Sequence, residues 1–187
     1  DLAAHGRGDH GGGCDRQKTL MCGRLNVSSG PLTILFMDMV SQPYPGSDRH
    51  NVAPTEPVQV LRATPAGALE AVPMRWWLTP YWSKEISTRY SMFNAKAETL
   101  ESSRAFREPL ERRRCLVPVA GFYEWVKEGD RKLPYYIRPQ ADDGMLLAGL
   151  WDRWRNADEV LESFTIVTTA AHESLAFVHN RQPALLS

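Results

Sequence analysis

A cysteine follows a methionine at Met21-Cys22, and this pair carries the most distinctive chemistry in the sequence. If Cys22 becomes the first residue of the chain, its α-amine and its thiol form a 1,2-aminothiol. The ordinary pKa values of these groups are about 8 and about 8.5, so both are nucleophiles close to neutral pH. An aldehyde can form a Schiff base with the amine, and the thiolate then closes a five-membered thiazolidine. Taken alone, the pair favours the simpler interpretation of a small buried cysteine without a chemical role.

One carboxylate interrupts an otherwise apolar and aromatic block that runs from Cys115 to Trp125. The block is typical of a buried strand, and Glu124 lies inside it. Burial is expected to raise the pKa of this carboxyl group toward the range that suits general acid–base work. A salt-bridge partner is easier to place on the surface, so we favour a chemical role for Glu124 over a structural one.

An amide and a cation alternate in the stretch from Phe93 to Thr99. On an extended segment, the side chains of Asn94 and Lys96 point the same way, which suits a sugar–phosphate ligand. Glu98 and Thr99, in contrast, have a good structural explanation as capping residues of a following helix.

A histidine and an arginine share a loop just before Pro183. A histidine is the usual side chain for proton transfer near neutral pH, so His179 could shuttle protons, and Arg181 lies two residues further on. The remaining histidines have no comparable setting. The pair His10 and Cys14 is too sparse to indicate zinc, so no metal or other cofactor is expected.

Aromatic side chains gather between Trp76 and Trp82 and are followed by Lys84 and Arg89. Most of these rings are expected in the core. One or two exposed rings beside cations could stack on unpaired bases without regard to sequence.

The composition sets limits on the protein that positions these groups. A chain of 187 residues with 43% hydrophobic content predicts a single globular domain, and 22 basic residues balance 22 acidic ones. Any nucleic-acid surface must therefore be a local patch. No apolar run is long enough for a membrane span, and three cysteines without a C-x-x-C pair indicate a reducing compartment, so the cytoplasm is expected.

The order of local patterns predicts an α+β fold. Capping residues and Pro31 precede a helix over 32–40, turn residues 64–67 join strands at 58–62 and 68–76, and charges at four-residue spacing predict a helix over 99–114. A last short helix is expected over 171–178. Further strands are expected at 115–119, 122–127, 135–138, 145–150 and 163–169. The result is a single compact domain with a mixed, largely antiparallel sheet and peripheral helices.

Residues 1–20, rich in glycine, are expected to be a disordered leader, a tag or a mis-called start ahead of a catalytic domain at 21–187.

Several short motifs, taken in order, resemble the SOS response-associated peptidase family, and the resemblance covers essentially all of 21–187. The motifs are Met21-Cys22-Gly23-Arg24, Asn51-Val52-Ala53-Pro54-Thr55, Arg75-Trp76 with Pro80-Tyr81-Trp82, Asn94-Ala95-Lys96-Ala97-Glu98-Thr99, Cys115 to Trp125, Ala148-Gly149-Leu150-Trp151 and His179-Asn180-Arg181. The strongest single block is the proline, glycine, aromatic, glutamate, tryptophan string that ends at Trp125.

The resemblance implies a compact α+β domain with a barrel-like core that binds single-stranded DNA and links its amino-terminal cysteine to the opened sugar of an abasic site. The family's peptidase name is compatible with an enzyme that removes its own leader, and a monomer is expected. The residues that match the family's active site are Cys22, Asn94, Glu124 and His179. The residues that match its DNA contacts are Arg24, Trp82, Lys96 and Arg181.

Three positions depart from the family pattern. Lys96 replaces the usual arginine and loses the bidentate fork, so a looser hold on phosphate is expected there. Trp77 stands where glycine is common, and Gln182 stands where methionine is common. The sequence also stops at Ser187, soon after the histidine loop, where family members continue, which suggests a C-terminal truncation.

Two other functions remain open. An amino-terminal cysteine hydrolase would use Cys22 as nucleophile, with Glu124 or His179 as proton carrier, on peptides or amides. A non-catalytic single-strand-binding module would bind DNA reversibly, with salt sensitivity and no covalent adduct. Labelling of Cys22 by an abasic oligonucleotide or by a peptide ester separates these functions.

Overall fold

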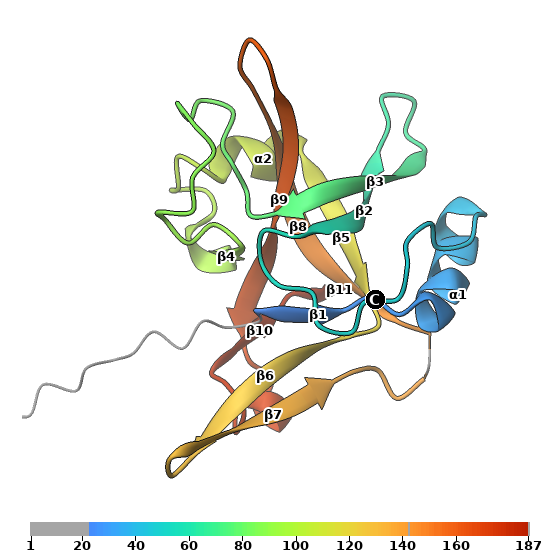
Figure 1. Ribbon diagram of the computed structural model, residues 1–187, viewed down its shortest axis with the longest axis vertical. Helices are drawn as coiled ribbons and strands as arrows, with labels where there is room; N and C mark the ends of the chain where they lie inside the picture. Colours follow the sequence, from blue (N-terminus) through green and yellow to red (C-terminus); the bar gives the residue numbers. More distant parts are fainter. Residues whose placement is uncertain (1–22, 142, 187) are drawn as a thin grey trace, which may run out of the picture.

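The computed structural model describes residues 23–141 and 143–186 (Figure 1). The helices are α1 (Ser29–Val40) and α2 (Arg107–Arg112), with two short 3-10 helices, η1 (Ala97–Thr99) and η2 (Glu173–Leu175). The strands are β1 (Arg24–Asn26), β2 (Pro57–Ala63), β3 (Leu69–Trp76), β4 (Asn94–Lys96), β5 (Arg114–Val119), β6 (Gly121–Glu128), β7 (Arg131–Ile137), β8 (Met145–Arg155), β9 (Val160–Ala170), β10 (Arg181–Pro183) and β11 (Leu185–Leu186).

Five strands close into a mixed barrel in the order β9, β3, β2, β5, β8, because β8 pairs with β9 as well as with β5. Every neighbouring pair in this ring is antiparallel except β3 and β9, which run parallel at Trp76 and Phe164. The far half of β9 leaves the ring and carries β4 on one edge and β10 on the other. This extension of β9 brings the two short strands close to each other.

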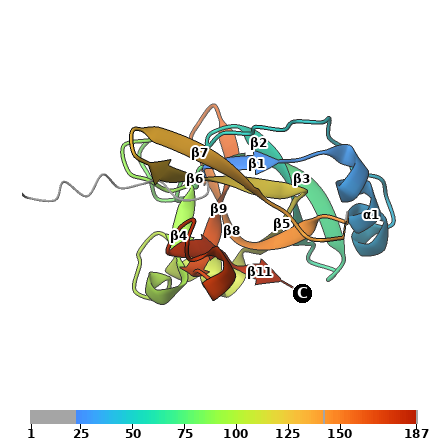
Figure 2. The same cartoon turned by 90° about the horizontal axis from the view of Figure 1, so that it is seen from below.

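A second, three-stranded antiparallel sheet has the order β1, β6, β7. The hairpin of β6 and β7 crosses the bottom of the molecule in Figure 1, and β1 lies along its inner edge. Seen from below, α1 lies at one end of the molecule and the turn between β6 and β7 lies at the other (Figure 2). No helix among the described residues is both long and apolar enough to cross a membrane.

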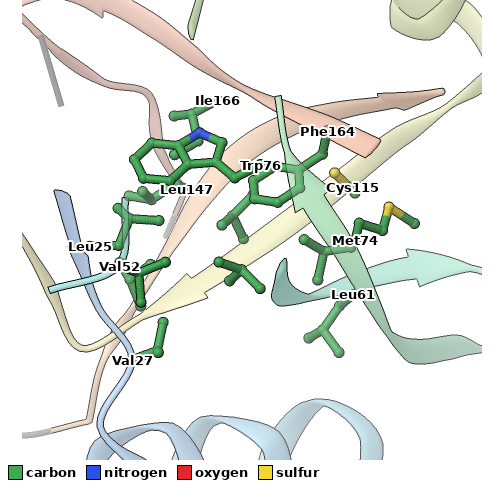
Figure 3. Packing of buried hydrophobic residues seen from close by; sticks show 14 of the residues in the cluster. Leu25, Val27, Val52, Leu61, Met74, Trp76, Cys115, Leu147, Phe164 and Ile166 are labelled. Atoms are coloured by element: carbon green, nitrogen blue, oxygen red, sulfur yellow. The ribbon is translucent and has the colours of Figure 1, made fainter. Parts of the chain in front are cut away.

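The main hydrophobic core joins side chains from the barrel strands, β1 and α1 (Figure 3). Trp76 is completely buried within it, and its indole nitrogen donates a hydrogen bond to the carbonyl oxygen of Phe93 at 2.9 Å. At Gly149, the strands approach so closely that an added Cβ atom would lie 2.8 Å from the sulfur of Cys115. The barrel wall is therefore tightly packed where β5, β8 and β9 meet.

The structure confirms the predicted α+β class, the helix after Pro31 and the hairpin around residues 64–67. The prediction of a helix over 99–114 is wrong, because α2 spans Arg107–Arg112 alone. Pro109 explains the difference, since proline fits the first turn of a helix but disrupts its interior. The expected helix over 171–178 is reduced to η2 at Glu173–Leu175.

Candidate active site

A small pocket lies between the β6–β7 sheet and the segment that joins η2 to β10. Both the buried carboxylate and the loop histidine of the sequence prediction line this pocket. Its lining residues are Phe122, Glu124, Ile137, Leu175, Val178, His179, Arg181 and Gln182. The structure thus brings Glu124 together with His179 and Arg181, from which it is far apart in the sequence.

Glu124 reaches the pocket because it lies on the inner face of β6. Phe122, two residues earlier, shares this face, and both side chains are buried, with exposed fractions of 2% for Phe122 and 3% for Glu124. Tyr123 and Trp125 point to the opposite face, as expected from the alternation of side chains along a strand. A carboxyl group that is almost fully buried and borders a pocket is a candidate for proton transfer.

His179 is held in one orientation by the loop around it. The backbone N–H of Arg181 donates a hydrogen bond to Nδ1 of the imidazole at 3.0 Å. In the neutral ring, Nδ1 is then the acceptor and Nε2 carries the proton. Two hydrogen bonds close the loop. The N–H of Ala171 donates to the backbone carbonyl oxygen of Asn180, and the N–H of His172 donates to the side-chain oxygen of Gln182. Gln182 therefore has a structural role in this loop.

The guanidinium of Arg181 forms a bidentate ion pair with Glu98, with both N–O distances at 2.9 Å. It also donates to the backbone oxygen of Thr168 at 2.6 Å. The hydrogen bonds from Arg181 lower the pKa of Glu98 to about 2. Arg181, which the family resemblance places at a phosphate, is thus already paired with an anion of the protein.

Asn94 and Lys96 both belong to β4, which runs parallel to β9. Ala95 between them is buried, so the two flanking side chains leave the strand on its other side, as the sequence pattern predicts. Lys96 is exposed, whereas Asn94 is half-buried and interacts with its surroundings. Neither Asn94 nor Lys96 lines the small pocket. They lie across β9 from β10, which begins at Arg181.

Arg24 is positioned by the pairing of β1 with β6, in which it lies opposite Tyr123, the neighbour of Glu124. Within the described part of the chain, its guanidinium makes one long contact, 3.4 Å to the side-chain oxygen of Asn51. Cys22 lies outside the described residues, so its predicted role stays a prediction.

Trp82 lies in a separate groove of about 270 Å³, which shares no lining residue with the small pocket. The residue is 38% exposed, and the guanidinium of Arg104 lies 4.2 Å from the centroid of its ring. Lys84 and Arg89 line the same groove. The structure thus shows an exposed ring beside cations, whereas binding of unpaired bases at this surface stays a prediction.

Two strands of the barrel hold the segment that carries Trp82. The N–H of Thr79 donates to the hydroxyl of Ser163 at 2.8 Å, and the N–H of Tyr81 donates to the carboxylate of Asp152 at 2.9 Å. Asp152 is almost fully buried, and this burial raises its pKa. The indole nitrogen of Trp154 donates to the carbonyl oxygen of Ser83. The groove is therefore built on rigid elements.

Sequence reasoning missed two residues of this region. Thr168 is a buried hydroxyl that contacts both Arg181 and the carbonyl oxygen of Ala95, and Glu98 pairs with Arg181 where a helix cap was expected. A hydroxyl at a buried position late in an apolar strand was the available signal for Thr168. Across the described residues, no group of three or more histidine, cysteine or acidic side chains could hold a metal ion.

Comparison with known proteins identifies the family. The chain belongs to the SOS response associated peptidase (SRAP) family, whose model matches residues 21–187. It is 33% identical over 173 residues to the abasic site processing protein YoqW of Bacillus subtilis, which covers 89% of this chain and 76% of that protein. It is 32% identical over 174 residues to the abasic site processing protein YedK of Escherichia coli, again covering 89% of this chain and 76% of the relative. A solved structure from Bacteroides thetaiotaomicron is similar with a TM-score of 0.74 and 26% identity, over 89% of this chain and 77% of that one.

Proposed function

We propose that this protein recognises abasic sites in single-stranded DNA and captures them covalently through Cys22. The observation that carries the proposal is the small pocket that Glu124, His179 and Arg181 line together, beside the sheet in which β1 pairs with β6. Relatives at 31–33% identity over 173 residues are named abasic site processing proteins.

The chemistry requires a free α-amine and a thiol on one residue. The amine of Cys22 attacks the aldehyde of the ring-opened abasic sugar, and loss of one water gives a Schiff base. The thiolate then adds to the carbon of the C=N bond, a new C–S bond forms, and the nitrogen takes up one proton. The net reaction joins an aldehyde and an aminothiol into a thiazolidine and releases one water.

The residues of the pocket suit the proton transfers in this sequence. Glu124 gives a proton to the leaving hydroxyl during the loss of water, which fits its burial next to the pocket. His179 assists the opening of the sugar ring and, in the reverse direction, the release of the adduct. Asn94 is assigned to orienting the sugar by hydrogen bonding.

The position of β1 supports the role of Cys22. Arg24 lies opposite Tyr123, so Glu124 is the next residue along the partner strand. Consecutive Cα atoms are about 3.8 Å apart, and Cys22 precedes Arg24 by two residues. The short separation in sequence between Cys22 and β1, whose partner strand carries Glu124, supports the assignment of Cys22 as the nucleophile.

DNA is held by cations and by an aromatic surface. Arg24 and Lys96 are assigned to phosphates, because neither has a salt bridge to another described residue. Trp82 in its groove is assigned to stacking on bases that flank the lesion. This arrangement needs no base-specific contact, which suits a lesion that has lost its base.

The proposed chemistry also requires the removal of residues 1–21, since a peptide bond at Cys22 would block the amine. Removal by an aminopeptidase after a start at Met21, or self-cleavage that uses Cys22 and Glu124, gives the same first residue. The family's description as a peptidase is compatible with the second route.

The test is crosslinking to an abasic oligonucleotide, followed on denaturing gels. Cys22→Ser should abolish the heat-stable adduct, because an oxygen at this position does not close a thiazolidine. Cys115→Ser is the matched control, since Cys115 is buried and its burial raises the pKa of its thiol, and it should crosslink like the wild type. Glu124→Gln should bind DNA but crosslink more slowly.

A heat-stable adduct at full yield in Cys22→Ser would refute the assignment. Labelling of Cys22 by a peptide ester without labelling by abasic DNA would favour an amino-terminal cysteine hydrolase. Binding that is reversible in every variant would favour a non-catalytic module.

A further inference from the structure

The side chain of Arg181 crosses β9 and connects the two short strands on its edges. Thr168 of β9 pairs with Lys96 of β4 on one edge and with Pro183 of β10 on the other. From β10, the guanidinium of Arg181 extends over Thr168 and reaches Glu98, in the 3-10 helix that follows β4. The ion pair therefore spans three strands.

Nearly all donors of this guanidinium are used inside the protein. The Nη1 and Nη2 groups each donate to one oxygen of Glu98, Nη2 donates again to the backbone oxygen of Thr168, and Nε donates to the Thr168 hydroxyl at 3.3 Å. A guanidinium has five N–H groups, so one on Nη1 remains for a ligand. Arg181 cannot offer a two-pronged fork to a phosphate while Glu98 holds it.

The same residue fixes the imidazole of His179. The hydrogen bond to Nδ1 comes from the backbone N–H of Arg181, so the ring orientation depends on where that residue lies. Because the side chain of Arg181 is tied to Glu98 and Thr168, its backbone is tied as well. The ion pair with Glu98, on the β4 side of β9, is thereby connected to His179, on the β10 side.

We propose that Glu98 is a positioning residue of the candidate active site, which orients Arg181 and, through its backbone, keeps Nε2 of His179 as the proton-bearing nitrogen presented for chemistry. The proposal rests on the proposed function for the identity of the reaction. Glu98 itself contacts neither DNA nor the reacting atoms in this role.

Exposure separates this role from one in overall stability. The side chain of Glu98 is 55% exposed, and exposed ion pairs add little to the stability of a protein. The carboxylate is nevertheless held by two oxygens at once, a geometry that gives orientation as well as attraction. Loss of Glu98 should therefore misplace the histidine without unfolding the domain.

The experiment compares Glu98→Gln with Glu101→Gln in the full chain. Glu101 is an exposed carboxylate three residues further along, so both variants remove one negative charge from the same segment. The first readout is the ¹⁵N spectrum of the histidine side chains, with His179 assigned through His179→Asn. The second is the crosslinking rate at saturating abasic DNA, measured together with the dissociation constant and Tm.

Glu98→Gln should change the His179 signal from a single Nε2–H tautomer to a mixture and reduce the saturating rate by roughly tenfold, since a misplacement of about 1 Å can reduce rates by a hundredfold. The Tm should remain that of the wild type, and DNA binding should not weaken. Glu101→Gln should match the wild type. In an Arg181→Lys background, which lacks the fork, Glu98→Gln should have no further effect.

An unchanged tautomer and rate in Glu98→Gln would overturn the proposal. A fall in rate that simply follows a fall in Tm would also overturn it, because the role would then be structural. If the wild type forms no adduct at all, the proposed function fails, and the His179 spectrum still decides whether Glu98 positions the ring.

Discussion

The salt dependence of DNA binding should distinguish the three basic residues of the site. For single-stranded DNA, each phosphate neutralised by a protein cation changes the slope of log K against log salt by about 0.7, because one condensed counterion is released. Arg24 has one long contact to an amide, and Lys96 has no salt bridge to a described residue. Arg181 already pairs with the carboxylate of Glu98.

The structure therefore predicts different slopes for three matched variants. Arg24→Gln and Lys96→Gln should each reduce the slope by about 0.7. When the salt concentration rises fourfold, from 50 to 200 mM, the factor by which each variant loses affinity should be about 2.6 times smaller than that of the wild type. Arg181→Gln should change the slope by much less, since the Glu98 carboxylate already balances that charge.

The assay is fluorescence anisotropy with a labelled single strand that contains a tetrahydrofuran abasic analogue. This analogue has no aldehyde, so binding stays reversible. Arg155→Gln is the control, because Arg155 is exposed and ends β8 at the tip of the β8–β9 hairpin. An unchanged slope in Lys96→Gln, or an equal reduction in Arg181→Gln, would refute the reasoning.

Two further predictions concern packing and pH. Gly149→Ala should lower the free energy of unfolding by about 1–3 kcal/mol in urea titrations, because the new Cβ meets the sulfur of Cys115 at 2.8 Å. The control is Gly30→Ala, which has open space around it on α1 and should not destabilise the protein. Equal unfolding midpoints for the two variants would contradict this prediction. The carboxyl ¹³C signal of Glu98 should titrate at a pKa of about 2, and Arg181→Lys should move it toward the ordinary 4.5. Because the pKa of Glu98 is lower in the folded protein than in the unfolded chain, any stability from this pair is complete above about pH 4.5 and is lost as the pH falls toward 2. A titration midpoint of Glu98 near 4.5 in the wild type would disprove the pairing in solution.

Local patterns predicted most of the fold. The hairpin of β2 and β3 follows from turn residues at 64–67, where Gly67 has a φ of 85°. The strand around Glu124 follows from an apolar run. Charge spacing alone predicts a helix over 99–114, which is wrong because Pro109 fits only the first turn of a helix and α2 spans Arg107–Arg112. Barrel closure depends on the pairing of β8 with β9 and the parallel contact of β3 with β9, which are tertiary contacts without a local signal.

The sequence predicted candidate residues for the site, but not how they are arranged in space. An isolated carboxylate at Glu124 and a loop histidine at His179 were visible in the sequence. Their shared pocket was not, because Glu124 lies in one sheet and His179 lies beside the other, and the two sheets meet only through tertiary packing. The pairing of Glu98 with Arg181 had no signal, since a glutamate at the start of a helical turn has an ordinary capping explanation.

The central claim concerns the first residue of the working protein. Intact-mass analysis before and after incubation with an abasic single strand tests it most directly, on one preparation that begins at Cys22 and one that retains Asp1. We predict that the first preparation gains the mass of the oligonucleotide less one water, and that the second gains no stable adduct. Equally fast formation of that adduct in the preparation that retains Asp1 would contradict the mechanism.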